Sequence, residues 1–164
     1  MKNLCIISSI LMIVVVCSCK EKTVLPVSPY KLTAEKNGVD WESKNTSGSI
    51  DKNFKKITVF GAESMDEYLS LQLKYTDLSN LESIKFINSE LNFLVGGDVV
   101  INSYSTDPTD VNNFVKIMQI DTVKKIMTGN FEFRLIKDKR WKTNIDTITY
   151  KKGQFVVNYT QYPK

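Results

Sequence analysis

From Tyr30 onward, the chain alternates apolar and polar residues in short runs separated by turn residues. Residues 68–75, YLSLQLKY, show the pattern most clearly, because three leucines and a tyrosine alternate with serine, glutamine and lysine. A period of two places one face of a strand against a core and the other in water, whereas a helix needs a period of 3.6. The body of the chain is therefore expected to consist of half-buried β-strands.

The turn residues set the number of strands. Asn37-Gly38 predicts a type I′ hairpin between two strands, and Gly96-Gly97 predicts a turn or bulge. Residues 76–86 are the least strand-like and are expected to hold one small helix, capped by Asp77 or Ser79. These signals favour one all-β domain, an antiparallel β-sandwich or lipocalin-like barrel of about eight strands with at most one short helix.

Later runs also show which side chains should meet in the core. Phe131, Phe133 and Leu135 are expected to share one strand face, and so are three residues near the C-terminus, Phe155, Val157 and Tyr159. Between these runs and the earlier strands, residues 102–113 are polar and are expected to form a loop. Trp41 follows the first hairpin turn and is expected to be in the core, with a ligand platform as the alternative.

The N-terminus has the pattern of a secretory signal. Lys2 is followed by an apolar run over residues 4–16 that is too short to span a bilayer as a helix. Residues 16–19, VCSC, resemble the lipobox of bacterial lipoproteins, in which cleavage occurs before an acylated cysteine. The expected organisation is a signal peptide over residues 1–18, an acylated Cys19 with a tether to residue 29, and a single β-domain over residues 30–164. The alternative is an ordinary secreted protein with incidental cysteines.

The lipobox resemblance implies a location as well. Acyl chains on Cys19 would hold the domain to a membrane without spanning it, so we expect an outer-membrane lipoprotein on the periplasmic face or at the cell surface. Lys20 and Glu21 partly resemble the surface-export signal of Bacteroidota lipoproteins. Because no cysteine follows Cys19, stability has to come from the core rather than from disulfides.

Three segments carry a further resemblance: NGVDW at residues 37–41, VKIMQIDTVKKIMTGNFEFRLI at 115–136 and ITYKKGQFVVNY at 148–159. Together they resemble a broad group of small uncharacterised lipoproteins of Bacteroidota. The resemblance extends over much of residues 36–159. It implies an all-β lipoprotein of unknown function, and it brings no catalytic residues.

Composition excludes several kinds of chemistry. The chain has no histidine, and no free thiol would remain after processing, so His-dependent triads, Cys-His catalysis and His-ligated zinc are excluded. The basic residues are spread along the chain with nearly as many acids, which argues against nucleic acid as a partner. We expect no catalytic residue and no cofactor, with a carboxylate-pair hydrolase as the remaining enzymatic alternative.

Two segments could bind ligands. Trp141, with Arg140 and Lys139, could stack on a sugar or contact lipid headgroups and anions, the alternative being a solvated loop with Trp141 folded back on the domain. The polar loop gathers oxygen donors of the kind calcium takes, namely Asp107, Asp110 and Asn112. The spacing matches no EF-hand, and an Asx-rich turn whose side chains bond their own backbone is the simpler interpretation.

The sequence leaves three function classes open. The first is a non-catalytic, membrane-anchored binding module for a glycan, a lipid or an envelope protein. The second is a structural or accessory subunit of an envelope assembly, which would show an apolar patch or an open strand edge. The third is the carboxylate-based hydrolase.

Overall fold

The computed structural model describes residues 29–141 and 146–163. Ten strands and one 3₁₀ turn account for most of them. The elements are β1 (Lys31–Lys36), β2 (Val39–Glu42), β3 (Asn45–Asp51), β4 (Lys56–Ser64), β5 (Glu67–Lys74), η1 (Leu81–Ser83), β6 (Lys85–Val95), β7 (Val99–Thr106), β8 (Phe114–Asp121), β9 (Ile126–Lys137) and β10 (Thr147–Tyr162). The all-β prediction is confirmed.

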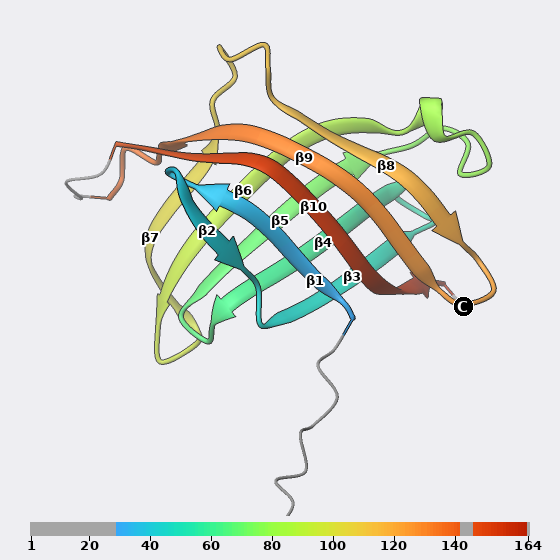
Figure 1. The fold of residues 1–164 in the computed structure, drawn as a ribbon, viewed down its shortest axis with the longest axis horizontal. Helices are drawn as coiled ribbons and strands as arrows, with labels where there is room; N and C mark the ends of the chain where they lie inside the picture. The colour runs from blue at the N-terminus through green and yellow to red at the C-terminus, as the bar shows by residue number, and fades with distance from the viewer. Residues whose placement is uncertain (1–28, 142–145, 164) are drawn as a thin grey trace, which may run out of the picture.

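All ten strands belong to one sheet with the order β2-β1-β10-β3-β4-β5-β6-β7-β9-β8. The sheet folds over into two layers, and Figure 1 shows β1, β9 and β10 crossing in front of β3, β4 and β5. Strand β10 joins the layers on one side, because it pairs with β9 and β1 and then runs parallel to β3. The pairing of β7 with β9 joins them on the other side. The result is a sandwich-like fold with one shared interior.

The interior is filled by the apolar face of each strand. Phe131, Phe133 and Leu135 of β9 are at most 2% exposed, as predicted. The expected face of β10 is buried as well, and so are the alternating leucines of β5. Phe133 lies between two other rings, with its centroid 5.3 Å from that of Phe131 and 6.5 Å from that of Phe86. Burial of these side chains supplies the main stabilising term of the fold.

The hairpin turns follow the sequence closely. Asn37 and Gly38 have φ values of 53° and 82°, the positive values that a type I′ turn requires, so the predicted hairpin is confirmed. Gly96 and Gly97 also have positive φ in the turn between β6 and β7. Glycine adopts these angles without strain from a Cβ, and asparagine tolerates them better than most residues, which explains the residue choice at both turns.

Several details differ from the sequence predictions. The short helix is the 3₁₀ turn η1, and its N-cap is Asn80 rather than Asp77 or Ser79. The polar loop starts at residue 107, because β7 runs on to Thr106. Residues 147–162 form the single long strand β10, which contains a bulge with Lys152 at φ 53°.

The strand count and one strand direction differ too. There are ten strands rather than about eight, and the parallel β10–β3 pairing makes the sheet mixed. The predicted signal peptide, the acylated Cys19 and nearly all of the tether lie outside the described residues. Within residues 29–141 and 146–163, no helix is long and apolar enough to cross a membrane.

Candidate functional site: a polar groove on the outer face of β5, β6 and β7

The outer face of the central strands carries a ladder of polar side chains. Leu69 and Leu91 point into the core, so their neighbours along each strand point outward. The strand register then aligns the outward residues in two rows across the sheet. The first row is Tyr68, Asn92 and Ser103, and the second is Ser70, Glu90 and Ser105.

A groove of about 610 Å³ lies over these rows. Its lining comes from β5, β6, β7 and the turn that follows β9. The lining residues are Tyr68, Asn88, Glu90, Asn92, Val100, Ser103, Ser105, Asp138, Arg140 and Trp141. The groove therefore combines two aromatic rings, two amides, two hydroxyls, two carboxylates and one guanidinium, with Val100 as the aliphatic contribution.

The turn over residues 138–141 forms one wall of the groove and is held in place by its own hydrogen bonds. The Asp138 backbone N–H donates to the Ser103 carbonyl oxygen at 2.9 Å, which fixes the turn against β7. The Trp141 N–H donates to the Asp138 carbonyl oxygen at 3.0 Å. The first bond ties the turn to β7 and the second closes the turn, and together they place Trp141 beside the groove.

Asp138 and Arg140 form a charge-assisted pair within this turn. The guanidinium donates to both carboxylate oxygens, with Nε at 3.1 Å from Oδ1 and Nη2 at 2.5 Å from Oδ2. Hydrogen bonds from the Arg140 side chain and backbone N–H, with a smaller contribution from its charge, lower the pKa of Asp138 to about 2. Asp138 is therefore ionised throughout the physiological range, so it accepts hydrogen bonds and does not donate a proton.

One polar atom in the groove wall has no partner. Trp141 Nε1 is buried, and no described residue accepts a hydrogen bond from it. An unmatched buried donor costs about 1–3 kcal/mol. This atom is shielded from solvent, so the exposed part of the indole ring, rather than its N–H, is what the groove offers to a ligand.

The sequence predicts three ligand-binding residues in this region, and the structure brings two of them together. Trp141 and Arg140 line the groove, whereas Lys139 is exposed and lies outside the lining set. The other lining residues were not foreseen. The signal for them was the alternation of Asn88, Glu90 and Asn92, which becomes readable only when residues 85–95 are recognised as a strand.

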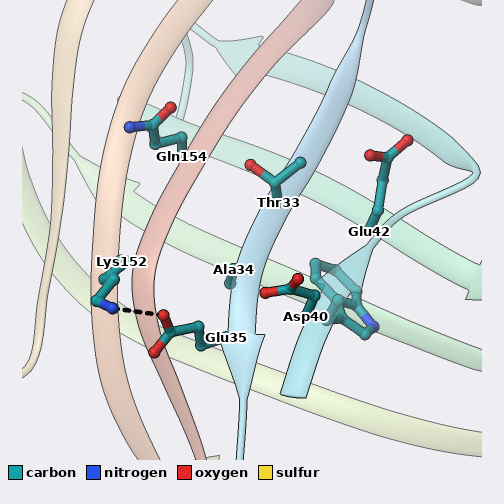
Figure 2. Close-up of a pocket in the computed structure, with 8 residues that line it drawn as sticks. Thr33, Ala34, Glu35, Asp40, Glu42, Lys152 and Gln154 are labelled. Atoms are coloured by element: carbon teal, nitrogen blue, oxygen red, sulfur yellow. Dashed lines mark hydrogen bonds and ion pairs between the residues drawn. The ribbon is translucent and has the colours of Figure 1, made fainter. Parts of the chain in front are cut away.

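A second depression, of about 470 Å³, lies over β1, β2 and β10. Figure 2 shows Glu35, Asp40 and Lys152 in it, with the ion pair that joins Lys152 Nζ to Glu35 Oε1 at 2.5 Å. Glu42 also has a partner, because its carboxylate lies 2.9 Å from Lys31 Nζ. Trp41 also lines this depression, but it is only 6% exposed and packs against Tyr150. Because it offers no exposed ring for stacking, the depression is a weaker candidate than the groove.

The proposed calcium residues are occupied by local hydrogen bonds. Asp107 Oδ1 accepts from the Thr109 N–H at 2.9 Å and the Thr109 hydroxyl at 2.6 Å, bonds that lower the pKa of Asp107. Asp110 Oδ1 accepts from the N–H and the side chain of Asn112. Among the described residues, no group of three or more Asp, Glu, His or Cys side chains is arranged to hold a metal ion. Calcium binding here stays a prediction. Without a metal, the aspartates form Asx turns with the backbone of their own loop.

Fold and groove together define a small all-β domain with an open, polar surface site. Comparison with known families places it further: residues 29–157 match the model of a domain of unknown function, DUF6252, and the chain belongs to that family. No curated protein and no solved structure matches the chain.

Proposed function

We propose that this protein is a membrane-anchored, non-catalytic binding module of the bacterial envelope whose groove over β5, β6 and β7 binds an oligosaccharide. The observation that carries the proposal is Trp141, whose partly exposed ring lines the groove. An indole offers an apolar face on which a sugar ring can stack.

The remainder of the lining supports a sugar rather than a lipid. Vicinal hydroxyl groups need donors and acceptors close together, and the Asn92 amide with the hydroxyls of Ser103 and Ser105 supplies both kinds. Tyr68 adds a second ring to the site. An acyl chain would instead cover the polar groups of the lining without forming hydrogen bonds to them, at a cost that disfavours lipid.

The carboxylates support binding rather than hydrolysis. A glycosidase needs a carboxylic acid that keeps its proton near neutral pH, which requires a raised pKa. The pKa of Asp138 is lowered to about 2 by Arg140, in the opposite direction. Glu90 accepts a hydrogen bond from Asn88 Nδ2 at 3.0 Å, which orders both side chains as groove walls.

Titration calorimetry of the full chain against a panel of cell-surface oligosaccharides tests the proposal. A binding sugar should lose about tenfold or more in affinity with Trp141→Ala, because the stacking surface is removed. Arg140→Gln should also weaken binding. The matched control Lys139→Gln removes an adjacent charge outside the groove and should leave affinity unchanged. Equal losses in the Arg140 and Lys139 variants would contradict a groove site, and release of reducing ends would contradict the non-catalytic proposal.

The anchor has its own test, which does not depend on the groove. Replacing Cys19 with alanine should abolish incorporation of a labelled fatty acid and leave unprocessed precursor, whereas Cys17→Ala should be acylated and cleaved as usual. Normal processing of the Cys19 variant would overturn the lipidation proposal. Brief protease treatment of intact cells would then distinguish surface display from the periplasmic face.

A further inference from the structure

Two hairpin loops of the domain share one local structure. Loop 52–55 follows Asp51 of β3, and loop 122–125 follows Asp121 of β8. In each, the aspartate Oδ1 accepts from the backbone N–H groups two and three residues later. The last loop residue, Lys55 or Lys125, has positive φ in both, 49° and 57°. The two loops are therefore equivalent rigid turns rather than loose connections.

These two loops lie at the same end of the sheet, on either side of the last residues of β10. The Tyr159 N–H donates to the Lys125 carbonyl oxygen at 2.8 Å. Three residues further along β10, the Tyr162 carbonyl oxygen accepts from the Lys52 N–H at 2.7 Å. With one strand between them, the loops are about 10 Å apart across the sheet, and the three-residue offset along β10 adds about 10 Å along the strands. They form one surface.

That surface exposes large apolar side chains at its tips. Phe54 is 73% exposed and Val123 is 90% exposed, and Tyr162 at the end of β10 is half exposed. Rigid turns hold these side chains in water, although the domain has an apolar interior. An exposed apolar cluster on a rigid support is typical of a docking surface.

Lysines surround the apolar tips. Lys52, Lys55 and Lys124 are exposed and form no ion pair with another described residue. Lys125 lies over the ring of Tyr159, with Nζ 5.7 Å from the ring centroid. The nearest acids, Asp51 and Asp121, direct their carboxylates to the N–H groups of their own loops. The surface therefore presents positive charge around an apolar centre.

The position at which the chain enters the domain is compatible with a membrane at this end. Strand β1 starts at Lys31, which is paired with Val156 of β10. The stretch of β10 from Val156 to Tyr162 extends roughly 20 Å toward the loops. The ten residues that precede Tyr30 can span about 33 Å when extended, so an N-terminal attachment leaves this end free to reach the membrane surface.

We propose that loops 52–55 and 122–125 dock on an anionic membrane surface, with Phe54 and Val123 inserted among the headgroups and the surrounding lysines against lipid phosphates. Anionic lipids attract lysines near a membrane surface, and apolar side chains add affinity when they leave water. This docking orients the groove, and it is independent of the ligand that the groove binds.

Lysine-acetylation footprinting of the full chain on phosphatidylcholine vesicles, with and without phosphatidylglycerol, tests the proposal. Lys52, Lys55 and Lys124 should be acetylated severalfold more slowly when phosphatidylglycerol is present. Lys139, in the connection after β9 at the other end of the strands, should react at an unchanged rate and serves as the internal control. Equal rates with both vesicles, or equal slowing at Lys139, would overturn the proposal.

A pair of surface variants separates insertion from general adsorption. Phe54→Ser combined with Val123→Ser should abolish the protection of the loop lysines. Met65→Ser is the matched control, because Met65 is 83% exposed in the turn after β4, at the opposite end, and its loss should leave protection intact. Protection that rises with protein concentration in the absence of vesicles would identify a protein–protein contact and overturn membrane docking.

Discussion

Trp41 and Tyr150 meet edge to face inside the domain, with 5.3 Å between ring centroids and 81° between ring planes. Both side chains are almost completely buried, and neither Trp41 Nε1 nor the Tyr150 hydroxyl has a hydrogen-bond partner among the described residues. Because the polar atoms make no compensating bonds, the cluster is held by ring contacts and burial. Removing one of these unpaired polar atoms should therefore lower the free energy of unfolding less than removing ring volume.

Tyr150→Phe is expected to keep the free energy of unfolding within about 1 kcal/mol of the wild type, or to raise it, because it removes an unmatched hydroxyl and keeps the ring. Tyr150→Ala should cost about 3–5 kcal/mol, since it empties the same volume. Guanidinium denaturation of both variants gives the comparison. A loss above 2 kcal/mol in the phenylalanine variant would mean that the hydroxyl has a stabilising partner.

High pH should destabilise the protein through the same residue. Burial, and then the charges of Glu67 and Glu63, raise the pKa of Tyr150 well above its ordinary value of 10.0. The unfolded chain therefore releases this proton first, so stability is complete below about pH 10 and falls as the pH rises beyond it. Burial raises the pKa of Tyr75 and Tyr159 in the same direction.

The check is the denaturation midpoint between about pH 8 and about pH 11. As the pH rises, the midpoint should fall less steeply in Tyr150→Phe than in the wild type. Near neutral pH, the two midpoints should differ only by the constant effect of the substitution on stability. Parallel declines in the two proteins would show that Tyr150 does not control alkaline stability.

Phe133 lies at the centre of the stacked rings and is 2% exposed. Phe133→Ala should lower the free energy of unfolding by about 3–5 kcal/mol, because a cavity remains where the ring packed. Phe60, which is 39% exposed on β4, is the matched control, and its replacement with alanine should cost much less. Similar losses at both positions would contradict the placement of the core.

Gly129 of β9 faces the ring of Phe155. A Cβ at this position would lie 2.3 Å from Phe155 Cζ and 2.4 Å from the Lys116 carbonyl oxygen, closer than atoms can approach. Gly129→Ala is therefore expected to cost about 1–3 kcal/mol through forced displacement of the ring and of β8. Asn130→Ala, on the exposed side of the same strand, should be nearly neutral, and thermal unfolding of the two variants makes the comparison.

The sequence predicted those parts of the fold in which local signals and the final environment agree. Asn37-Gly38 forms its turn without tertiary contacts, and the alternation of the β5 leucines alone identifies the buried face of that strand. Strand β3 was not predicted, because NTSGSID is polar and small, and it becomes a strand by pairing with β4 and, in parallel, with β10. Such a pairing between distant segments leaves no local pattern in the sequence.

The candidate site was only partly predictable for the same reason. Trp141 and Arg140 attracted attention by residue type, whereas Asn92 and Ser103 become neighbours only through the β6–β7 register. In the sequence, Lys139 is as good a candidate for binding an anionic or polar ligand as Arg140. Only the turn geometry shows that Arg140 lines the groove and Lys139 does not. Residue type was therefore enough to identify Trp141 and Arg140 at the edge of the groove. The residues on its floor could be identified only from the strand register.

The indole N–H resonances of the two tryptophans give the most direct test of the central claim that the groove binds a sugar. In a ¹⁵N–¹H spectrum of the full chain, assigned with Trp141→Phe, added oligosaccharide should shift the Trp141 signal, because the sugar ring packs against the indole. The Trp41 signal should stay in place, since that ring is packed against Tyr150 in the core. Movement of Trp41 alone, or an unmoved Trp141 at sugar concentrations where calorimetry records binding, would contradict the groove as the binding site.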